Sequence, residues 1–463
     1  MAINISNFFI RNIQKNIKLS RHYAKSTHPF TKTWGIINKE IKSGFTQPTD
    51  YPQHADVVII GGGFIGSSAA YWLKTRAGEG LSVVVIEKDT TYEKCHNINS
   101  HGFTTQHFTL PENIYLSQYS AEFLRNIKTH LREDVDIEYS PHGTLMLASE
   151  KYAHKLEENV AMQREYGVKN KILTGEEIQK IYPWLKTSDI KLGCISTESE
   201  GTFNAHNLLK GLVVKSKELG ATYVKAEVVG FEIEAQRDVL MEGVKPGSFN
   251  KINSLLYRNE DNEEISLKFA VCVVAAGTES THIAELASIG KGNDLLTVPL
   301  PVEKRTYNVY AIENEANKMS FGLNTPLIMD TSGLWLRRNG LQNNLVCGLI
   351  PPLKPTDIPD RDIFHASICN RYPGCVDSKI QTLSTEYFDC NTYDDTGILG
   401  PHPYYTNMIF ATGFSRQGVH HSPAIGKGVA ELIIDCHYST IDLSRFGFDR
   451  ILIDEPVIEF NMY

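Results

Sequence analysis

Residues 55–87 read ADVVIIGGGFIGSSAAYWLKTRAGEGLSVVVIE, and this stretch decides the fold. The β-branched, continuously apolar runs at 57–60 and 83–86 are typical of central parallel strands that are covered on both faces. Between them the turn at 61–66 satisfies G-x-G-x-x-G, and residues 67–74 are predicted to form a helix. A strand, a glycine turn, a helix and a second strand in this order predict a dinucleotide-binding βαβ unit.

The glycines of this turn each have a physical task in holding a dinucleotide. Gly61 permits the tight strand-to-helix turn, Gly63 lets backbone N–H groups approach a pyrophosphate, and Gly66 brings the helix close to the strand. Glu87 can accept hydrogen bonds from the adenosine ribose, and its carboxylate would repel a 2′-phosphate, which argues against NADP. The βαβ unit lies at the start of the folded part of the chain. The sequence shows no second glycine motif that would bind a nicotinamide nucleotide, so FAD is the expected nucleotide.

Two later segments complete the predicted nucleotide site. The apolar run 269–274 predicts another buried strand, which leads into residues 275–277. Near the C-terminus, a strand at 408–411 leads into the turn 412–418, and a helix is expected over about 424–435. The N-terminus of that helix can face the pyrimidine edge of a flavin, where the helix dipole would favour the anionic reduced form. An ordinary strand–turn–helix without a ligand is the alternative.

Length and charge distribution set further bounds. A chain of 463 residues is too long for one ordinary core, so two lobes are expected. No apolar run is long enough to span a bilayer, so any membrane contact would be peripheral. Residues 1–39 contain seven basic and no acidic residues, with isoleucines near helical spacing, which is typical of a mitochondrial presequence. We expect processing after Tyr23 and a linker over 24–54; a solvated basic tail is the alternative.

Composition argues against nucleic acid and against a metal site. Removal of residues 1–23 takes away four basic residues, so 46 basic against 54 acidic residues become 42 against 54, and the net charge changes from −8 to −12. A protein with this net negative charge is a poor candidate for binding nucleic acid. The eight cysteines are scattered without zinc-ligand spacing, so no metal is predicted and a reducing compartment such as the mitochondrial matrix is expected.

From about residue 55 to the end, the chain resembles the D-amino-acid-oxidase/sarcosine-oxidase superfamily of FAD-dependent enzymes. Within that superfamily the similarity is closest to a mitochondrial group that serves in assembly of respiratory complex I. The segments that carry this closer similarity are 110–114, 123–127, 330–333, 337–338, 400–403 and 440–443. The resemblance implies an α/β fold with a Rossmann-type FAD domain and a substrate domain built on an antiparallel sheet.

The resemblance also implies domain boundaries and cofactor contacts. The implied segments are 55–125, 197–285 and 385–445 for a discontinuous FAD-binding domain, 126–196 and 286–384 for the substrate-type domain, and 446–463 for a C-terminal tail. The expected FAD-binding residues are Gly61, Gly62, Gly63, Phe64, Ile65, Gly66, Glu87, Lys88, Ser100, Gly102, Val228, Ala276, Gly277, Gly413, Phe414, Ser415 and Gly418. FAD is expected to be non-covalent, because Cys390 falls several residues after the position that carries the covalent link in sarcosine oxidase.

The chain departs from the superfamily at positions that usually touch the flavin or the substrate. Where sarcosine-oxidase-like members carry an arginine for the substrate carboxylate, residues 104–106 read Thr-Thr-Gln, and the lysine that provides a second anchor falls on His420. The lysine that helps oxidases react with oxygen falls near residues 346–347, which are Val and Cys. Arg416 and Glu386 stand where glycines are common, and these two side chains can pair with each other or narrow the pocket.

Three residues are candidates for catalytic work, namely Arg337, His420 and Tyr387. Arg337 lies on a strand where related enzymes hold a substrate carboxylate; a solvated surface arginine is the alternative. His420, beside the expected flavin face, is of a type that can titrate near neutral pH; a satisfied histidine at a helix start is the alternative. Tyr387 can line the pocket or serve in packing.

Two functions are compatible with these observations. The first is a mitochondrial FAD-binding protein of the matrix, or of the matrix face of the inner membrane, whose partners are complex I subunits or assembly intermediates. The second is an FAD-dependent dehydrogenase or oxidase of a small secondary amine or N-methyl amino acid. The missing carboxylate anchors favour the first hypothesis, and the intact nucleotide-binding pattern suits both, because a fold does not fix a function.

Overall fold

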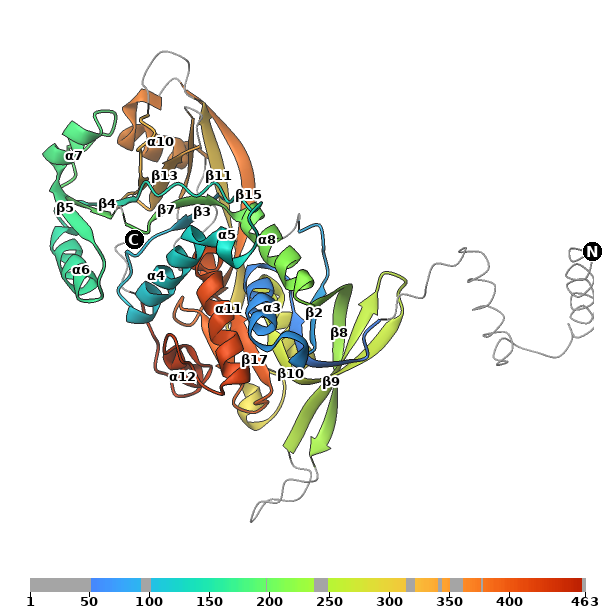
Figure 1. Cartoon of the computed structure of the whole chain (residues 1–463). Helices are drawn as coiled ribbons and strands as arrows, with labels where there is room; N and C mark the ends of the chain where they lie inside the picture. Colours follow the sequence, from blue (N-terminus) through green and yellow to red (C-terminus); the bar gives the residue numbers. More distant parts are fainter. Residues whose placement is uncertain are drawn as a thin grey trace, which may run out of the picture. The chain divides into compact units, whose positions relative to one another are not determined.

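The computed structural model describes residues 51–92, 101–196, 198–236, 249–313, 321–339, 344–349, 361–375 and 378–459 (Figure 1). The predicted presequence, most of the predicted linker and Ser100 lie outside these residues. Residues Pro52–Tyr463 form one compact unit, and the domain boundaries within this unit stay a prediction. Among the described helices, none is both long and apolar enough to cross a membrane.

The predicted βαβ unit lies in a seven-stranded sheet. Its strands are, in spatial order, β1 (His54–Ile60), β2 (Val83–Glu87), β8 (Thr222–Gln236), β9 (Phe249–Asn259), β10 (Glu264–Val274), β17 (Met408–Thr412) and β16 (Ile398–Pro401). β1 pairs in parallel with both β2 and β10, and β17 continues in parallel beside β10. Side chains 57–60 of β1 are at most 4% exposed, which confirms the prediction of a central strand covered on both faces.

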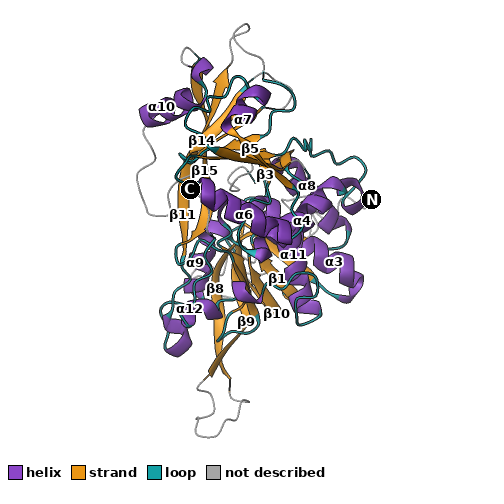
Figure 2. Ribbon diagram, turned by 90° about the vertical axis from the view of Figure 1, so that its left-hand side faces the viewer, coloured by secondary structure: helices purple, strands orange, loops and turns teal. Residues whose placement is uncertain are grey.

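Four helices pack beside this sheet (Figures 1 and 2), and two of them approach each other closely. These helices are α3 (Phe64–Ala77), α4 (Pro111–Arg125), α8 (Ala205–Glu218) and α11 (Gly418–Ile434). A Cβ added at Gly426 of α11 would lie 2.3 Å from the hydroxyl of Ser68 on α3, so the contact requires glycine. The indole N–H of Trp72 donates to the carbonyl of Pro423 at 2.8 Å and fixes the same contact.

α11 begins at Gly418, six residues before the predicted start at 424. The predicted start was therefore late, and Pro423 lies inside the helix. Proline lacks the N–H that would bond to the carbonyl of Val419, which normally ends or kinks a helix. Here the hydroxyl of Ser422 donates to that carbonyl at 2.8 Å, so the freed acceptor keeps a partner and the helix continues.

The second large sheet has eight strands and carries a hydrophobic core on one face. Its strands are, in spatial order, β15 (Lys379–Asn391), β11 (Val302–Glu313), β14 (Leu345–Leu349), β13 (Leu334–Arg338), β12 (Leu327–Met329), β4 (Thr144–Ala148), β6 (Leu192–Ser196) and β5 (Asn170–Thr174). All neighbours are antiparallel except β12 and β4, which agrees with the expected antiparallel sheet. One face packs with Trp184, Phe364 and Tyr372, and the opposite face carries Tyr307, Val346 and Phe388.

The remaining helices and strands are short. They are β3 (His101–Thr104), β7 (Gly201–Asn204), α5 (Ile127–His130), α6 (Ala153–Glu165), α7 (Gly175–Ile181), α9 (Ser280–Leu286), α10 (Arg361–Arg371) and α12 (Asp449–Leu452). β3 and β7 pair with each other in an antiparallel ribbon.

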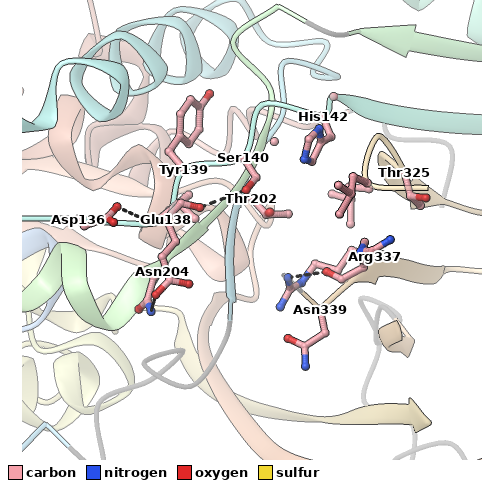
Figure 3. A pocket seen from close by; sticks show the side chains of 16 residues that line it. Asp136, Glu138, Tyr139, Ser140, His142, Thr202, Asn204, Thr325, Arg337 and Asn339 are labelled. Atoms are coloured by element: carbon pink, nitrogen blue, oxygen red, sulfur yellow. Dashed lines mark hydrogen bonds between the residues drawn. The ribbon is translucent and has the colours of Figure 1, made fainter. Parts of the chain in front are cut away.

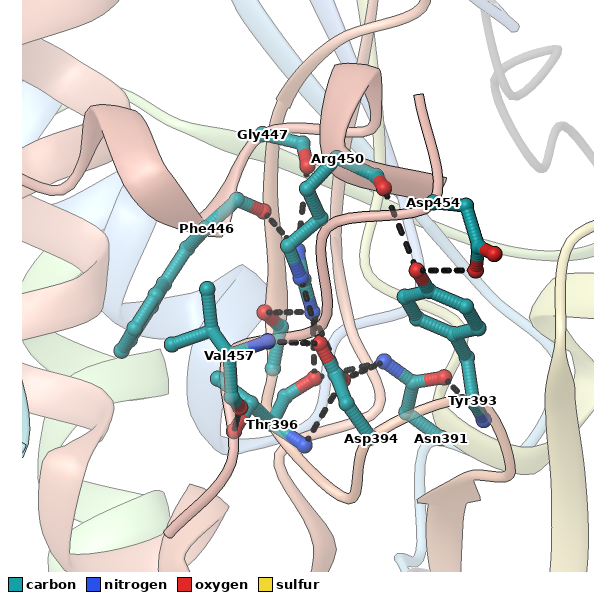
Figure 4. A network of polar contacts seen from close by, with 10 residues as sticks. Asn391, Tyr393, Asp394, Thr396, Phe446, Gly447, Arg450, Asp454 and Val457 are labelled. Atoms are coloured by element: carbon teal, nitrogen blue, oxygen red, sulfur yellow. Dashed lines mark hydrogen bonds and ion pairs between the residues drawn. The ribbon is translucent and has the colours of Figure 1, made fainter. Parts of the chain in front are cut away.

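A buried polar network fastens the C-terminal segment (Figure 4). Arg450 of α12 is 5% exposed and forms an ion pair with Asp394 at 2.7 Å. The same guanidinium donates to the carbonyls of Phe446, Thr396 and neighbouring residues, and Asp394 also accepts the N–H of Val457 at 3.0 Å. Each buried charge therefore has several partners, which is the condition for a buried ion pair to be tolerated.

Candidate functional site

The turn between β1 and α3 can be built only from glycine at its two critical positions. Gly61 has φ +97°, and a Cβ at this position would lie 2.4 Å from the carbonyl oxygen of Ala275. A Cβ at Gly66 would lie 1.9 Å from the carbonyl oxygen of Gly61. The chain is therefore folded tightly where α3 begins, and the first N–H groups of this helix form the kind of terminus that binds phosphate.

Glu87 ends β2 beside this turn. Its Oε2 accepts the N–H of Gly62 at 2.7 Å, and its Oε1 accepts the N–H of Asp89 at 2.8 Å. Burial raises the pKa of Glu87, while these two N–H donors act in the opposite direction. A carboxylate has about four acceptor positions, so the expected contact with a ribose remains open to Glu87.

The other residues expected around the adenosine half have different surroundings. Val228 is buried on β8 at a β-bulge, where the register shifts between Val228 and Gly230. Gly102 lies on β3, and a Cβ there would lie 2.3 Å from the ring of Phe203. Lys88 forms an exposed ion pair with Glu227 at 2.6 Å. The side chain of Lys88 is 68% exposed, so the structure does not place it against the turn at Gly61.

The C-terminal turn after β17 lies next to the first turn. Gly413 has φ +74° and Ser415 has φ +51°, so the chain turns sharply before α11. The ring of Phe414 fills the space where a Cβ of Gly397 would stand, 2.2 Å away. A Cβ added at Gly418 would lie 3.8 Å from the Cδ1 of Ile65 on α3, so the two predicted cofactor turns meet at these residues.

These residues fit FAD. The glycine turn at the start of α3 suits the pyrophosphate, Glu87 suits the ribose, and the N-terminus of α11 lies within reach of the same cradle. Ala276 and Gly277 follow β10, and the hydroxyl of Thr412 donates to the Gly277 carbonyl at 3.3 Å. Among the described residues, no group of His, Cys, Asp and Glu side chains suits a metal ion.

Asp389 holds the C-terminal turn and was not predicted from the sequence. Its Oδ2 accepts the N–H of Gly413 at 2.6 Å and the hydroxyl of Thr412 at 3.2 Å. Although part of the residue is accessible to solvent, desolvation of the carboxylate raises the pKa of Asp389 to about 6. Sequence reasoning missed it because β15 and β17 belong to different sheets, and their contact cannot be read from either strand.

Asp389 gives a pH-dependent prediction. A carboxylate whose pKa is raised in the fold, here from 3.8 to about 6, stabilises the protein below pH 3.8, and this stability is lost as the pH rises through 6. We therefore expect Asp389→Asn to become progressively more stable than the wild type between pH 4 and pH 7, measured as the difference in urea midpoints. Asp134→Asn is the control, because Arg132 lowers the pKa of exposed Asp134. A constant difference for Asp389→Asn would contradict the assignment.

A cavity of about 600 Å³ opens between residues 136–143 and β7 on one side and β12 and β13 on the other (Figure 3). Its lining combines apolar surface with polar side chains, which include Asp136, His142, Thr202, Asn204, Arg337 and Asn339. Figure 3 shows the guanidinium of Arg337 on the wall opposite Thr202 and Asn204. The cavity therefore presents a cation from a strand of the eight-stranded sheet.

Arg337 is buried and incompletely paired. It is 3% exposed, and its Nη1 donates to the carbonyl of Arg338 at 3.1 Å. Its Nε and Nη2 have no hydrogen-bond partner among the described residues. Burial lowers the pKa of Arg337 to about 9, which is still above neutral pH, so the guanidinium keeps its charge. A buried cation with two unused donors at a cavity wall is suited to hold an anion.

Glu386 and Tyr307 form a second polar group on the same sheet. Glu386 is 4% exposed; its Oε2 accepts the hydroxyl of Tyr307 at 3.1 Å, and its Oε1 accepts the hydroxyl of Ser384 at 3.1 Å. Burial raises the pKa of Glu386, and the positive charge of Arg337 opposes this effect. Burial raises the pKa of Tyr307, and the positive charge of Arg416 opposes this effect.

His420 does not titrate near neutral pH in this structure. It is 1% exposed at the start of α11, and its ring stacks on Phe108 with a centroid distance of 6.1 Å and an interplanar angle of 20°. Burial lowers the pKa of His420 to about 3 and that of His421 well below its ordinary value. Both rings are neutral at pH 7, which argues against the titrating interpretation of His420 and favours the alternative of a histidine packed at a helix start.

Tyr387 lies apart from the group formed by Glu386 and Tyr307. Successive side chains of a strand point to opposite faces, so Tyr387 does not share the face of Glu386. The ammonium of Lys304 lies 3.8 Å from the centroid of the Tyr387 ring, a favourable cation–π geometry. Cys390 is buried, and its Sγ lies 3.4 Å from an Asp395 oxygen.

A buried ion pair follows the segment in which no cation was expected. His107 comes directly after residues 104–106, and its Nε2 lies 3.7 Å from the Oε2 of Glu200; both side chains are at most 1% exposed. Burial disfavours the charged imidazolium of His107, but the Glu200 carboxylate and neighbouring groups favour it and raise the pKa of His107 to about 9. Glu200 also accepts the N–H of Gln106 at 2.9 Å, which fixes the segment leading to Phe108. Sequence reasoning missed this pair, because the partners are far apart along the chain.

Comparison with known proteins gives the family to which the chain is similar. A family model described as FAD dependent oxidoreductase matches residues 56–432. The chain is 41% identical over 424 residues to a Drosophila melanogaster protein named FAD-dependent oxidoreductase domain-containing protein 1 homolog, with 90% of this chain and 82% of that protein covered. It is 38% identical over 439 residues to the Xenopus laevis FAD-dependent oxidoreductase domain-containing protein 1, with 91% and 87% covered.

A solved structure shares the fold. The crystal structure of L-proline dehydrogenase from P. horikoshii superposes with a TM-score of 0.71 at 22% identity and covers 88% of this chain and 100% of its own. At this identity the likeness concerns the fold alone.

Proposed function

The chain belongs to the FAD dependent oxidoreductase family, and on that premise we propose that it is a mitochondrial FAD-binding protein required for assembly of respiratory complex I. One observation carries the proposal: the glycine turn at Gly61 and Gly66 and the carboxylate of Glu87 suit FAD, whereas His420, at a position where related oxidases anchor a substrate carboxylate, is buried and neutral. A protein that keeps its cofactor but loses such an anchor is suited to a role in which the bound flavin matters more than amino-acid turnover.

The residues that would hold FAD have separate tasks. The N–H groups at the start of α3 would bind the pyrophosphate, Glu87 the ribose, and the N-terminus of α11 the pyrimidine edge. Bound FAD supplies a two-electron acceptor.

Location and partners follow from the same proposal. The basic, acid-free segment at 1–39 supports import into the mitochondrial matrix, with processing after Tyr23. Complex I subunits or assembly intermediates are the proposed partners, and contact with the inner membrane would be peripheral. The test is the migration of the native protein from mitochondria. Co-migration with partly assembled complex I supports the role. Migration only as a free monomer, with complex I unaffected by loss of the protein, contradicts it.

A second function is favoured by the cavity at Arg337. The same chain can be an FAD-dependent dehydrogenase or oxidase of a small secondary amine or N-methyl amino acid. Arg337 is buried and has two unused donors at the cavity wall, so it can bind a substrate carboxylate in a bidentate way. Glu386 has a pKa that burial raises, so this carboxylate is suited to hold a proton at an Oε atom. The two functions are compatible.

The second function is tested by anaerobic titration of the flavin absorbance band with amines. We expect N-methyl amino acids to bleach the band and matched N-methylamines without a carboxylate to do so far less well. Loss of a charged hydrogen-bond pair costs ~2–3 kcal/mol, so Arg337→Met should weaken the response to the carboxylated amine by about 30- to 150-fold and leave the response to the other amine unchanged. A flavin that no amine reduces would contradict this function.

A further inference from the structure

Two thiols meet where α10 ends, on the side of the eight-stranded sheet away from Arg337. The Sγ atoms of Cys369 and Cys375 lie 3.3 Å apart. His365 precedes Cys369 by one helical turn, and both of its ring nitrogens lie 3.7 Å from the Cys369 Sγ. None of these residues belongs to the cofactor cradle or lines the cavity at Arg337.

The backbone between the two thiols is firmly held. Arg371 is 1% exposed and donates to both carboxylate oxygens of Asp189, at 3.0 and 2.9 Å, and to Asp330 at 2.8 Å. Tyr372 is fully buried in the core beside Trp184. The short connection from Cys369 to Cys375 is therefore fixed at its centre, and the two sulfur atoms stay in contact. A disulfide needs a sulfur–sulfur distance of about 2.05 Å, so only a small movement is required.

The two thiols differ in access to solvent. Cys369 is half-buried on α10, whereas Cys375 is fully buried in the core. A small oxidant therefore reaches Cys369 first, and Cys375 is protected from direct attack. An accessible thiol in contact with a protected one is the usual arrangement of an attacking and a resolving cysteine.

We propose that Cys369 and Cys375 form a peroxide-sensitive dithiol that is oxidised reversibly to an intramolecular disulfide. In the first step the Cys369 sulfur attacks hydrogen peroxide, which gives the sulfenic acid and one molecule of water. In the second step the Cys375 sulfur displaces hydroxide from the sulfenic acid, and its thiol proton leaves with the hydroxide as a second water. Two thiols and one peroxide thus give one disulfide and two waters. His365 is placed to accept the thiol proton of Cys369.

The proposal is tested on the full-length protein with one equivalent of hydrogen peroxide. Thiols that remain are alkylated, and the digested protein is examined by mass spectrometry. We expect a peptide with Cys369 linked to Cys375, lighter by two hydrogens, and two fewer alkylated thiols of the eight in the chain. Dithiothreitol should restore both thiols. The test does not depend on bound flavin or on complex I.

Two variants make the result decisive. Cys375→Ser should stop at a Cys369 sulfenic acid that dimedone traps, because the resolving thiol is absent. Cys436→Ser is the control, because Cys436 is exposed and has no part in the dithiol; the linked peptide should form as in the wild type. The proposal is overturned if wild-type Cys369 accumulates as sulfinic acid without a linked peptide. It is also overturned if Cys375 pairs instead with Cys347, another buried thiol of the same core.

Discussion

Arg371→Met is expected to lower the free energy of unfolding by ~3–5 kcal/mol, whereas Arg337→Met is expected to raise it by ~1–2 kcal/mol. Both arginines are buried, at 1% and 3% exposure, so each substitution replaces a buried guanidinium with the same apolar side chain. The difference lies in their partners. Arg371 forms ion pairs with Asp189 and Asp330, and its removal leaves the 3%-exposed side chain of Asp330 without its cation.

Arg337 has the opposite balance of forces. Its guanidinium is removed from water, and among the described residues its hydrogen-bond acceptor is the carbonyl of Arg338. The charge of Glu386 acts on it through space. Methionine keeps most of the packing and removes the desolvated charge. The gain is limited because the Arg338 carbonyl then lacks a donor and Glu386 loses a nearby positive charge.

Urea denaturation of the two variants and the wild type at pH 7, in the same buffer and without added ligand, measures both effects. A natural protein keeps an unstable buried charge where function needs it, so a more stable Arg337→Met that no longer binds anions supports a ligand role for the cavity. If Arg337→Met proves as destabilised as Arg371→Met, then Arg337 is a structural cation and the cavity argument fails.

Gly66→Ala is expected to remove FAD from the protein. The added Cβ would stand 1.9 Å from the carbonyl oxygen of Gly61, so the start of α3 must move away from the turn. A displacement of this kind in a packed region costs about 3 kcal/mol, which corresponds to a loss of FAD affinity of about 100-fold. Gly80→Ala is the matched control, because nothing lies within 4 Å of its Cβ position.

The flavin-to-protein absorbance ratio of the purified variants gives the FAD content, and the urea midpoint shows whether each variant is folded. We expect a folded Gly66→Ala with little flavin and a Gly80→Ala that matches the wild type. A Gly66→Ala protein that retains stoichiometric FAD would show that the turn before α3 is not the site of the pyrophosphate.

The features that the sequence predicted correctly are local ones. The strand, glycine turn and helix at 55–77 follow from residues within a few positions of each other, and the structure places Gly61 and Gly66 where only glycine fits. The runs of apolar and aromatic residues at 307–312 and 345–348 are local signals of the same kind, and they lie in β11 and β14.

The features that were missed depend on contacts between distant segments. The ion pair of His107 with Glu200 joins the segment after β3 to the residue before β7, and Asp389 reaches Gly413 from another sheet. The sequence left two interpretations of His420 open, because its pKa depends on how deeply the ring is buried. The alternation of side chains along β15 is a signal that sequence reasoning could have used. Glu386, Phe388 and Cys390 share a buried face, and a glutamate on a buried face indicates a special role.

The proposed requirement of this FAD-binding chain for assembly of complex I is decided by the amount of assembled complex in cells. Cells that lack the chain are supplied with the wild type, Gly66→Ala or Gly80→Ala, and assembled complex I is quantified on native gels. We expect little assembled complex without the chain, restoration by the wild type and by Gly80→Ala, and failure of Gly66→Ala. A normal amount of complex I in cells without the chain would contradict it.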